Sequence, residues 1–251
     1  MSSREDWQRR LGPLYGGAVA LVHSTPWRWP TEVGGDPRVA GWLVVLGVPI
    51  GAVAWIAAAL VHAAGLPNSI AALMGLATLS LASAALIERG LAARVDHWDG
   101  REGGEGEDGE VRSPGVLSVL VLVFVILVRA GAILALPPAS WLAVLIATAV
   151  VGRWSAMLIQ ALGDPIAHGD ARRSLVTTPA PAWLVATITV GVTAITVLAI
   201  GKAGILALAL TALAAFALGL EAQRKDGGLS GPVVATVAAV GELVVLLVAA
   251  M

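Results

Sequence analysis

Seven long runs of apolar residues, separated by short breaks or polar segments, set the pattern of this chain. The runs cover residues 39–65, 67–87, 115–136, 139–162, 182–201, 203–220 and 231–251. A helix of roughly 20 apolar residues crosses a bilayer core about 30 Å thick, and each run meets or approaches that length. The pattern therefore predicts an all-α, polytopic integral membrane protein. We expect about seven transmembrane helices in a single membrane domain, residues 1–251.

The segments between the runs carry nearly all of the charge. Thirteen of the 16 Lys and Arg residues lie in four of them, residues 1–38, 88–114, 163–181 and 221–230. With seven spans these four segments fall on one side of the membrane, and the other side carries only Lys202. Because Lys and Arg are enriched in cytoplasmic loops, the distribution predicts a cytoplasmic N-terminus, a cytoplasmic loop 88–114 and a C-terminus outside.

Composition agrees with a multi-pass protein of the plasma membrane, which is the inner membrane of a bacterial cell. Hydrophobic residues make up 57% of the chain and charged residues 13%, whereas about a quarter of a soluble domain is charged. The net charge of −1 gives a nucleic acid no electrostatic attraction. The chain has no cysteine, which excludes thiolate metal sites. Within the N-terminal segment, residues 11–25 are too short to span, and we expect an interfacial or re-entrant helix there, with an irregular loop as the alternative.

Three charged residues, Arg129, Arg153 and Glu242, lie inside predicted spans. An isolated charge in the bilayer core costs several kcal/mol, so we expect these side chains to be paired or hydrated. A structural ion pair between Arg153 and Glu242 explains two of the charges. The alternative is functional: Arg153, about 13 Å from the cytoplasmic end of its helix, faces a water-filled pocket. There its forked guanidinium would bind an anion such as phosphate.

The predicted cytoplasmic loops hold the other candidate residues. Asp96 and Asp99 would lie one turn apart on one helix face, and carboxylates so placed could hold Mg²⁺, which binds substrate phosphates through one or two carboxylates. A solvated acidic loop is the alternative, and it is the interpretation we give to residues 104–110. Arg172 and Arg173 either reflect only the cytoplasmic location of their loop or contact a phosphate group. The glycines of residues 227–231 turn the chain or let the backbone approach a ligand.

Four segments follow the pattern of one family. Residues 227–231 with Glu242 resemble a Gly-Gly-x-Thr-Gly-Asp stretch and the Glu-rich helix after it, and residues 152–163 resemble a Gly-Arg helix. Gly115 with Arg129 resembles a glycine followed by a basic residue within the next span. Residues 90–96 resemble part of an acidic signature, His-Leu-Asp-Gly-Leu-Ala-Asp-Thr-x-Asp-Gly. In all four segments the chain resembles the cobalamin synthases (adenosylcobinamide-GDP ribazoletransferases), which are membrane enzymes of about this length.

The acidic signature is only partly kept. In its register Asp96 is retained, while the histidine and two aspartates of the family are replaced by Ile87, Arg89 and Ala93. A diverged relative is therefore the expectation. Its site would depend on Asp96, with Asp99 or Glu88 beside it.

The resemblance implies a Mg²⁺-dependent phosphoryl-type transferase in the last steps of cobalamin biosynthesis. It would join adenosylcobinamide-GDP to α-ribazole or its phosphate and release GMP. The implied catalytic residues are Asp96, Asp99 and Arg153, and the implied metal ligands are Asp96, Asp99 and Glu88. The implied substrate-binding residues are Arg129, Arg172, Arg173, Gly228, Ser230, Gly231 and Glu242.

The implied partners are the lipid bilayer and a corrinoid nucleotide at the cytoplasmic face, without nucleic acid, and a homo-oligomer is compatible with this reading. Two other functions stay open. One is a catalytically inactive relative that acts as a membrane assembly partner. The other is a small-solute transporter with Arg153 and Glu242 at its midplane site.

Overall fold

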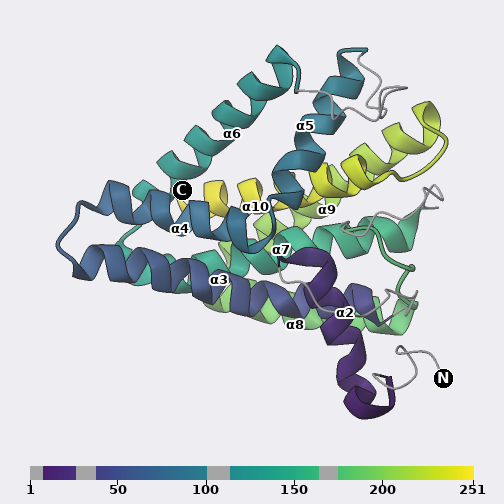
Figure 1. Ribbon diagram of the computed structural model, residues 1–251, viewed down its shortest axis with the longest axis horizontal. Coiled ribbons are helices and arrows are strands. Elements are labelled where there is room, and N and C mark those ends of the chain that lie inside the picture. The colour runs from purple at the N-terminus through teal and green to yellow at the C-terminus, as the bar shows by residue number, and fades with distance from the viewer. Residues whose placement is uncertain (1–7, 27–37, 101–113, 164–174) are drawn as a thin grey trace.

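The structure is a computed structural model that describes residues 8–26, 38–100, 114–163 and 175–251. Its elements are all helices (Figure 1). In chain order they are η1 (Gly12–Leu14), α2 (Tyr15–Ser24), α3 (Val39–Ala63), α4 (Asn68–Ala82), α5 (Leu86–Trp98), α6 (Val116–Leu134), η2 (Pro138–Ser140), α7 (Trp141–Leu162), α8 (Ala182–Ile200), α9 (Ala203–Lys225) and α10 (Gly231–Ala249).

The predicted class, an all-α protein with several membrane-spanning helices, is confirmed. Among the described residues six helices are long and apolar enough to cross a bilayer, and the count rises to seven if α4 and α5 together form one span. Within the expected second span, residues 67–87, the helix is not continuous. It ends at Ala82, and α5 leaves at an angle of 80°.

The break between α4 and α5 depends on two alanines with a backbone that alanine rarely adopts. Ala84 and Ala85 have positive φ values of 53° and 52°, a conformation that costs a residue with a Cβ about 1 kcal/mol. The turn is otherwise satisfied, since the Ala84 N–H donates to the Leu81 carbonyl at 2.9 Å and the Ala85 N–H to the Ser80 carbonyl at 2.8 Å. No glycine or proline marks the position, so the apolar pattern runs through it.

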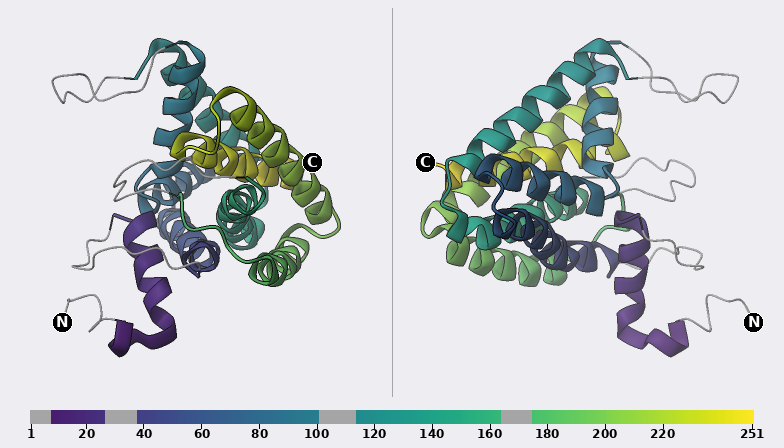
Figure 2. Two further views of the ribbon diagram at one scale, coloured as in Figure 1. Left: turned by 90° about the vertical axis from the view of Figure 1, so that its right-hand side faces the viewer. Right: turned by 60° about the vertical axis from the view of Figure 1, so that its left-hand side comes forward.

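Helix α7 lies at the centre of the molecule, between α3, α10, α8 and α9 (Figure 2). Small residues allow the helices to approach closely, as is common in membrane proteins. A Cβ at Gly51 of α3 would come within 2.5 Å of the Ile146 Cα of α7. A Cβ at Gly90 of α5 would come within 2.1 Å of the Ala235 Cβ of α10. Helix α5 is thus pressed against α10, and α3 against α7.

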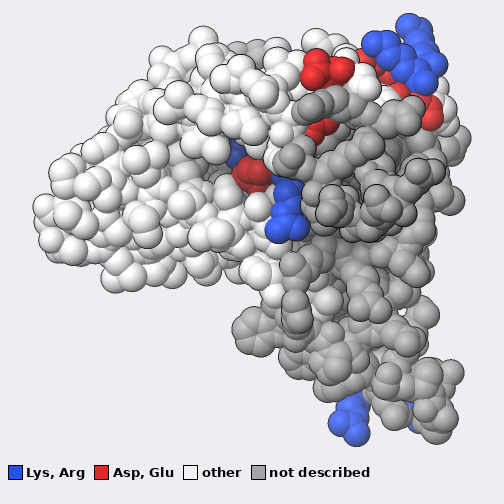
Figure 3. Space-filling view, turned by 45° about the horizontal axis from the view of Figure 1, so that its top comes forward, with Lys and Arg blue, Asp and Glu red and all other residues white. Residues whose placement is uncertain are grey.

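The ends of the helices sort into two sets. The end of α5, the start of α6 and the α9–α10 turn, residues 226–230, lie toward one end of the molecule, and the α3–α4 and α8–α9 turns lie toward the other (Figure 1). Among the described residues in the view of Figure 3, the left-hand part of the surface carries no charged side chain, and Lys, Arg, Asp and Glu gather toward the right. This arrangement fits the charge asymmetry of the sequence, and the orientation in the membrane stays a prediction.

Candidate functional site

Two arginines and two carboxylates meet inside the bundle, in what we call the inner cluster: Glu88 of α5, Arg129 of α6, Arg153 of α7 and Glu242 of α10. Glu242 forms an ion pair with each arginine. Its Oε2 lies 2.9 Å from Arg129 Nη2, and its Oε1 lies 3.9 Å from Arg153 Nη1. The expected contact between Arg153 and Glu242 is therefore present, but the closer partner of Glu242 is Arg129.

Arg153 is the largest fully buried side chain among the described residues, with 1% of its surface exposed. Its Nη1 donates to the Ala149 carbonyl at 2.9 Å, and its Nη2 donates to the Ser83 hydroxyl at 2.6 Å. Ser83 is the first residue of the break between α4 and α5. The break therefore supplies a polar partner to a guanidinium that no water reaches.

Glu88 enters the cluster from the first turn of α5. Its Oε1 accepts a hydrogen bond from the Ser80 hydroxyl of α4 and lies 3.4 Å from Arg129 Nη1. The change of direction after Ala82 points α5, and with it Glu88, toward Arg129 of α6. Four helices thus contribute one charge each, and the two positive and two negative charges balance.

Several polar atoms of the inner cluster have no hydrogen-bond partner although they are buried. They are Glu88 Oε2, Arg129 Nε, Arg153 Nε and Glu242 Oε1. Buried donors and acceptors are normally satisfied, and unmet ones call for water or a ligand. The inner cluster therefore has two donors and two acceptors still free to bind something small and polar.

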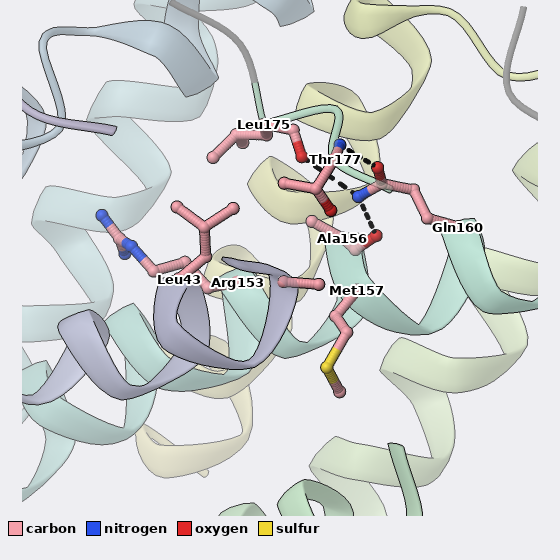
Figure 4. A pocket seen from close by; sticks show the side chains of 8 residues that line it. Leu43, Arg153, Ala156, Met157, Gln160, Leu175 and Thr177 are labelled. Carbon is pink, nitrogen blue, oxygen red and sulfur yellow. Dashed lines mark hydrogen bonds between the residues drawn. The ribbon is translucent and has the colours of Figure 1, made fainter. Parts of the chain in front are cut away.

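A small hollow beside Arg153 is too narrow to hold a water molecule. It is lined by Leu43 of α3, by Met157 and Gln160 of α7 and by Leu175 and Thr177 of the segment before α8. The Gln160 side chain holds that segment: its Nε2 donates to the Leu175 carbonyl at 3.1 Å, and its Oε1 accepts from the Thr177 N–H at 2.6 Å. Figure 4 shows the Arg153 guanidinium turned away from Gln160, Leu175 and Thr177. The hollow is thus apolar packing beside the stem of Arg153, and its guanidinium faces the inner cluster.

A second group of charges, the outer cluster, lies at the far end of α5: Arg94 and His97 of α5, Glu221 of α9 and Asp226 of the α9–α10 turn. Arg94 is 3% exposed. Its Nη1 donates to Asp226 Oδ2, its Nη2 lies 3.9 Å from Glu221 Oε1, and its guanidinium lies 5.3 Å from the centre of the Trp98 ring. His97 Nε2 lies 3.1 Å from the other oxygen, Asp226 Oδ1.

The partners of Asp226 decide its charge. Partial burial acts to raise the pKa of this carboxyl, but hydrogen bonds from Arg94 and His97 outweigh it and leave the pKa below the ordinary value. Asp226 is therefore ionised near neutral pH. The bond that joins α5 to the α9–α10 turn is an ion pair.

Asp96 points to a different neighbour. Its Oδ1 accepts from the Gly115 N–H at 2.9 Å and from the Ser118 hydroxyl at 2.8 Å. Gly115 is the residue at which α6 begins, and α6 has no cap from its own residues. Asp96 therefore serves as the missing cap of α6, because the first N–H groups of a helix need an outside acceptor.

The similarity to known proteins covers this arrangement. The family described as cobalamin-5-phosphate synthase matches residues 20–250, a stretch that includes every residue of both clusters. The chain belongs to the cobalamin-5-phosphate synthase family. It is 32% identical over 201 residues to the adenosylcobinamide-GDP ribazoletransferase of Azorhizobium caulinodans, covering 74% of each chain. No solved structure matches it.

The magnesium site implied by the resemblance to cobalamin synthases does not fit the carboxylates named for it. Glu88 and Asp96 are eight residues apart on α5, about 12 Å at the rise of a helix, and Glu88 is already paired with Arg129. One oxygen of Asp96 caps α6, and Asp99 is exposed at the helix end. Within the described ranges no three His, Asp or Glu side chains lie close enough to hold one ion.

The other residues implied by the cobalamin synthase resemblance separate into two places. Arg129 and Glu242 lie in the inner cluster, and residues 228–231 lie at the α9–α10 turn beside the outer cluster. There Gly228 is buried, Ser230 is the residue before α10, and α10 begins at Gly231 without a side-chain cap. Arg172 and Arg173 lie outside the described residues. We expected Asp96 and Arg153 in a single site. In the structure Arg153 belongs to the inner cluster, at the start of α5, whereas Asp96 lies near the end of α5, beside the outer cluster.

Reasoning from the sequence missed Arg94, Asp226 and Ser83. Arg94 and Asp226 were ordinary charges of two polar segments, and Ser83 was one small residue in an apolar run. One signal was available for Arg94. Its position, two residues before the retained Asp96, lies in the acidic signature of the cobalamin synthases, where the family has threonine.

Proposed function

We propose that the chain is a ribazoletransferase that acts at the cytoplasmic face of the membrane. A hydroxyl of α-ribazole, or of its phosphate, attacks the cobinamide-linked phosphorus of adenosylcobinamide-GDP. A P–O bond forms to ribazole, the P–O bond to GMP breaks, and the hydroxyl proton passes to a carboxylate. The relative named above carries this activity in its name.

The observation that carries the proposal is the buried inner cluster on the helices that the family shares. Arg129, Arg153 and Glu242 are costly inside a bilayer, and such residues usually mark a functional site. They lie in the part of the chain, residues 20–250, that matches the family. The four polar atoms without partners add to this, because a purely structural network would have satisfied them.

Phosphoryl transfer depends mainly on positioning the reactants and on neutralising their charge. We assign one part of this to the region of the outer cluster (the outer level) and one part to the inner cluster (the inner level). At the outer level the N-terminus of α10, with Ser230 and Gly231, would receive the diphosphate, as helix N-termini attract anions. Asp96 and Asp99 are the carboxylates that would take the proton. At the inner level Arg153 would supply positive charge from inside the bundle.

Magnesium belongs to this proposal through the family alone. A divalent ion would supply further neutralisation of the diphosphate. The described carboxylates do not form a three-ligand site for it, so no step above depends on it.

Complementation of a bacterial strain that lacks cobalamin synthase tests the proposal. The chain should restore growth that requires cobalamin. Asp96→Asn keeps an oxygen to cap α6 but removes the charge, and it should abolish the rescue at equal protein levels. Asp108→Asn, in the same polar segment but outside the described residues, is the control and should leave growth unchanged.

Failure of the parent chain at normal membrane levels would contradict the transferase. A non-catalytic membrane partner would then be the better account. The replacement of the signature aspartates by Arg89 and Ala93 is the observation in its favour.

A further inference from the structure

Helix α5 needs an anchor beyond its own sequence. It follows an 80° break, and the residues at the break, Ala84 and Ala85, hold a strained backbone. A short link of this kind does not fix the direction of the next helix. The direction of α5 must therefore be set by the side chains along it.

Two side chains near the end of α5 make such contacts, on two different neighbours. Asp96 binds the start of α6, as described above. Arg94 binds Asp226, in the turn between α9 and α10, and reaches toward Glu221 at the end of α9. Arg94 is therefore the residue that ties α5 to residues 226–230, the turn that precedes α10.

Arg94 occupies its position as a desolvated cation. Only 3% of the residue is exposed, and its guanidinium lies over the ring of Trp98. A buried guanidinium is tolerated when it is paired and hydrogen-bonded. Here the pairing is with carboxylates from a different part of the chain, so removing the guanidinium would leave those carboxylates facing one another.

With the neighbouring Lys225 included, the charges of the outer cluster are balanced without any added ion. Arg94 and Lys225 are positive, and Asp226 and Glu221 are negative, with Lys225 Nζ 3.0 Å from Glu221 Oε1. Both oxygens of Asp226 already have partners, Oδ2 in Arg94 and Oδ1 in His97. The inner cluster is balanced as well, as its two arginines and two carboxylates show.

We propose that Arg94 is a positioning residue that acts as a fixed internal cation. Its guanidinium holds the end of α5 against the α9–α10 turn and so keeps Asp96 and residues 228–231 in place without a divalent metal ion. This extends the proposed function, on which its relevance to catalysis rests. The measurements below need no transferase activity, so the two proposals can fail separately.

The test is the melting temperature of the purified full-length protein in detergent, with EDTA and with millimolar Mg²⁺ or Ca²⁺. The parent should melt at the same temperature in all three conditions. Arg94→Ala should melt several degrees lower in EDTA and should regain part of the loss when either cation is added, because Asp226 and Glu221 are left unbalanced. A variant with a purely structural defect would not respond to the cations.

Two further variants complete the test. Arg94→Ala combined with Asp226→Ala removes the carboxylate as well, and the response to cations should disappear. Arg89→Ala, at an exposed position on the same helix, should behave like the parent. A parent protein stabilised by Mg²⁺ would overturn the proposal, and so would an Arg94→Ala variant that does not respond to either cation.

A pair of cysteines reports the positioning directly. With His97→Cys and Arg224→Cys in the cysteine-free chain, a short bifunctional reagent should link the end of α5 to the end of α9. Adding Arg94→Ala should reduce the yield several-fold in EDTA, and Mg²⁺ should restore part of it. An unchanged yield in the Arg94→Ala background would contradict the positioning role.

Discussion

The inner and outer clusters both contain arginine and carboxylate side chains, but they differ in how far these side chains are exposed to water. The inner cluster lies among membrane-spanning helices, and Arg153 and Glu242 are each 1% exposed. In the outer cluster the cation is buried, but its partners reach the surface, with 14% of the Asp226 side chain and 52% of the His97 side chain exposed. In the inner cluster Glu88 alone is partly exposed, at 18% of its side chain. The same pairing chemistry thus operates once around three buried side chains and once near the protein surface.

The difference concerns what each cluster can tolerate. A charge that loses its partner inside a bilayer cannot be rescued by solvent, whereas one at the surface can be hydrated, screened or neutralised by a proton or a metal ion. The inner cluster should therefore respond to mutation in an all-or-none manner. The outer cluster should respond to ions and pH.

Loss of Glu242 should have the largest effect. Glu242→Ala leaves two buried arginines with Glu88 as their one remaining carboxylate in the inner cluster. Truncating one member of a buried ion pair costs about 3–5 kcal/mol. We expect a loss of that order in the free energy of unfolding, measured by denaturation in detergent.

A second change in the Glu242→Ala background sharpens this result. Arg129→Met should restore more stability than Arg153→Met, because Arg129 lies 2.9 Å from Glu242 and Arg153 lies 3.9 Å from it. Equal effects would show that the two arginines share Glu242 evenly. Additive losses in both double variants would rule out the pairing.

The strained turn between α4 and α5 should give a smaller effect of opposite sign. Ala85→Gly relieves a positive φ, and we expect the free energy of unfolding to rise by about 1 kcal/mol or less. Ala77→Gly, at an exposed position inside α4, should lower it by about 1 kcal/mol. If both variants are destabilised in the same way, the turn is not strained.

The smallest expected effect is the pH response of the outer cluster. The pKa of Asp226 is lowered in the folded protein by its hydrogen bonds from Arg94 and His97. Its stabilisation is therefore complete above the pKa of an unfolded aspartate and is lost as the pH falls through the lower, folded pKa. Glu221 and Lys225 also face this group and must be kept unchanged.

A melting-temperature series checks this. Asp226→Asn should melt below the parent at neutral pH, and the difference between the two should shrink only in strong acid. A difference that is independent of pH would show that the Asp226 charge does not contribute.

Much of the fold could be predicted because apolar length is a direct signal. The class and the buried charges followed from runs of about 20 apolar residues and from charged residues inside them. The break after Ala82 could not be predicted, because alanine at positive φ is unfavourable and no glycine or proline nearby indicates a turn. Contacts of Ser83 with Arg153 and of Glu88 with Arg129 help to stabilise it, and both arginines lie on helices far away in the sequence.

The candidate site was predicted less completely for a related reason. Arg129, Arg153 and Glu242 are conspicuous because charge is rare in a span. Arg94 and Asp226 lie among other charges, and only the packing of α5 against α10 shows that one of them is buried. Whether a charge is paired depends on three-dimensional contacts, which spacing along the chain does not encode.

The most direct test of the proposed ribazoletransferase activity is an assay of the reaction with purified protein. Purified protein in lipid vesicles is incubated with adenosylcobinamide-GDP and α-ribazole, and GMP and the corrinoid product are quantified by chromatography and mass spectrometry. A ribazoletransferase releases GMP and forms the ribazole-linked corrinoid in equal amounts, and Asp96→Asn forms neither. Folded protein that forms no product from these substrates, with Mg²⁺ present or absent, would contradict the account.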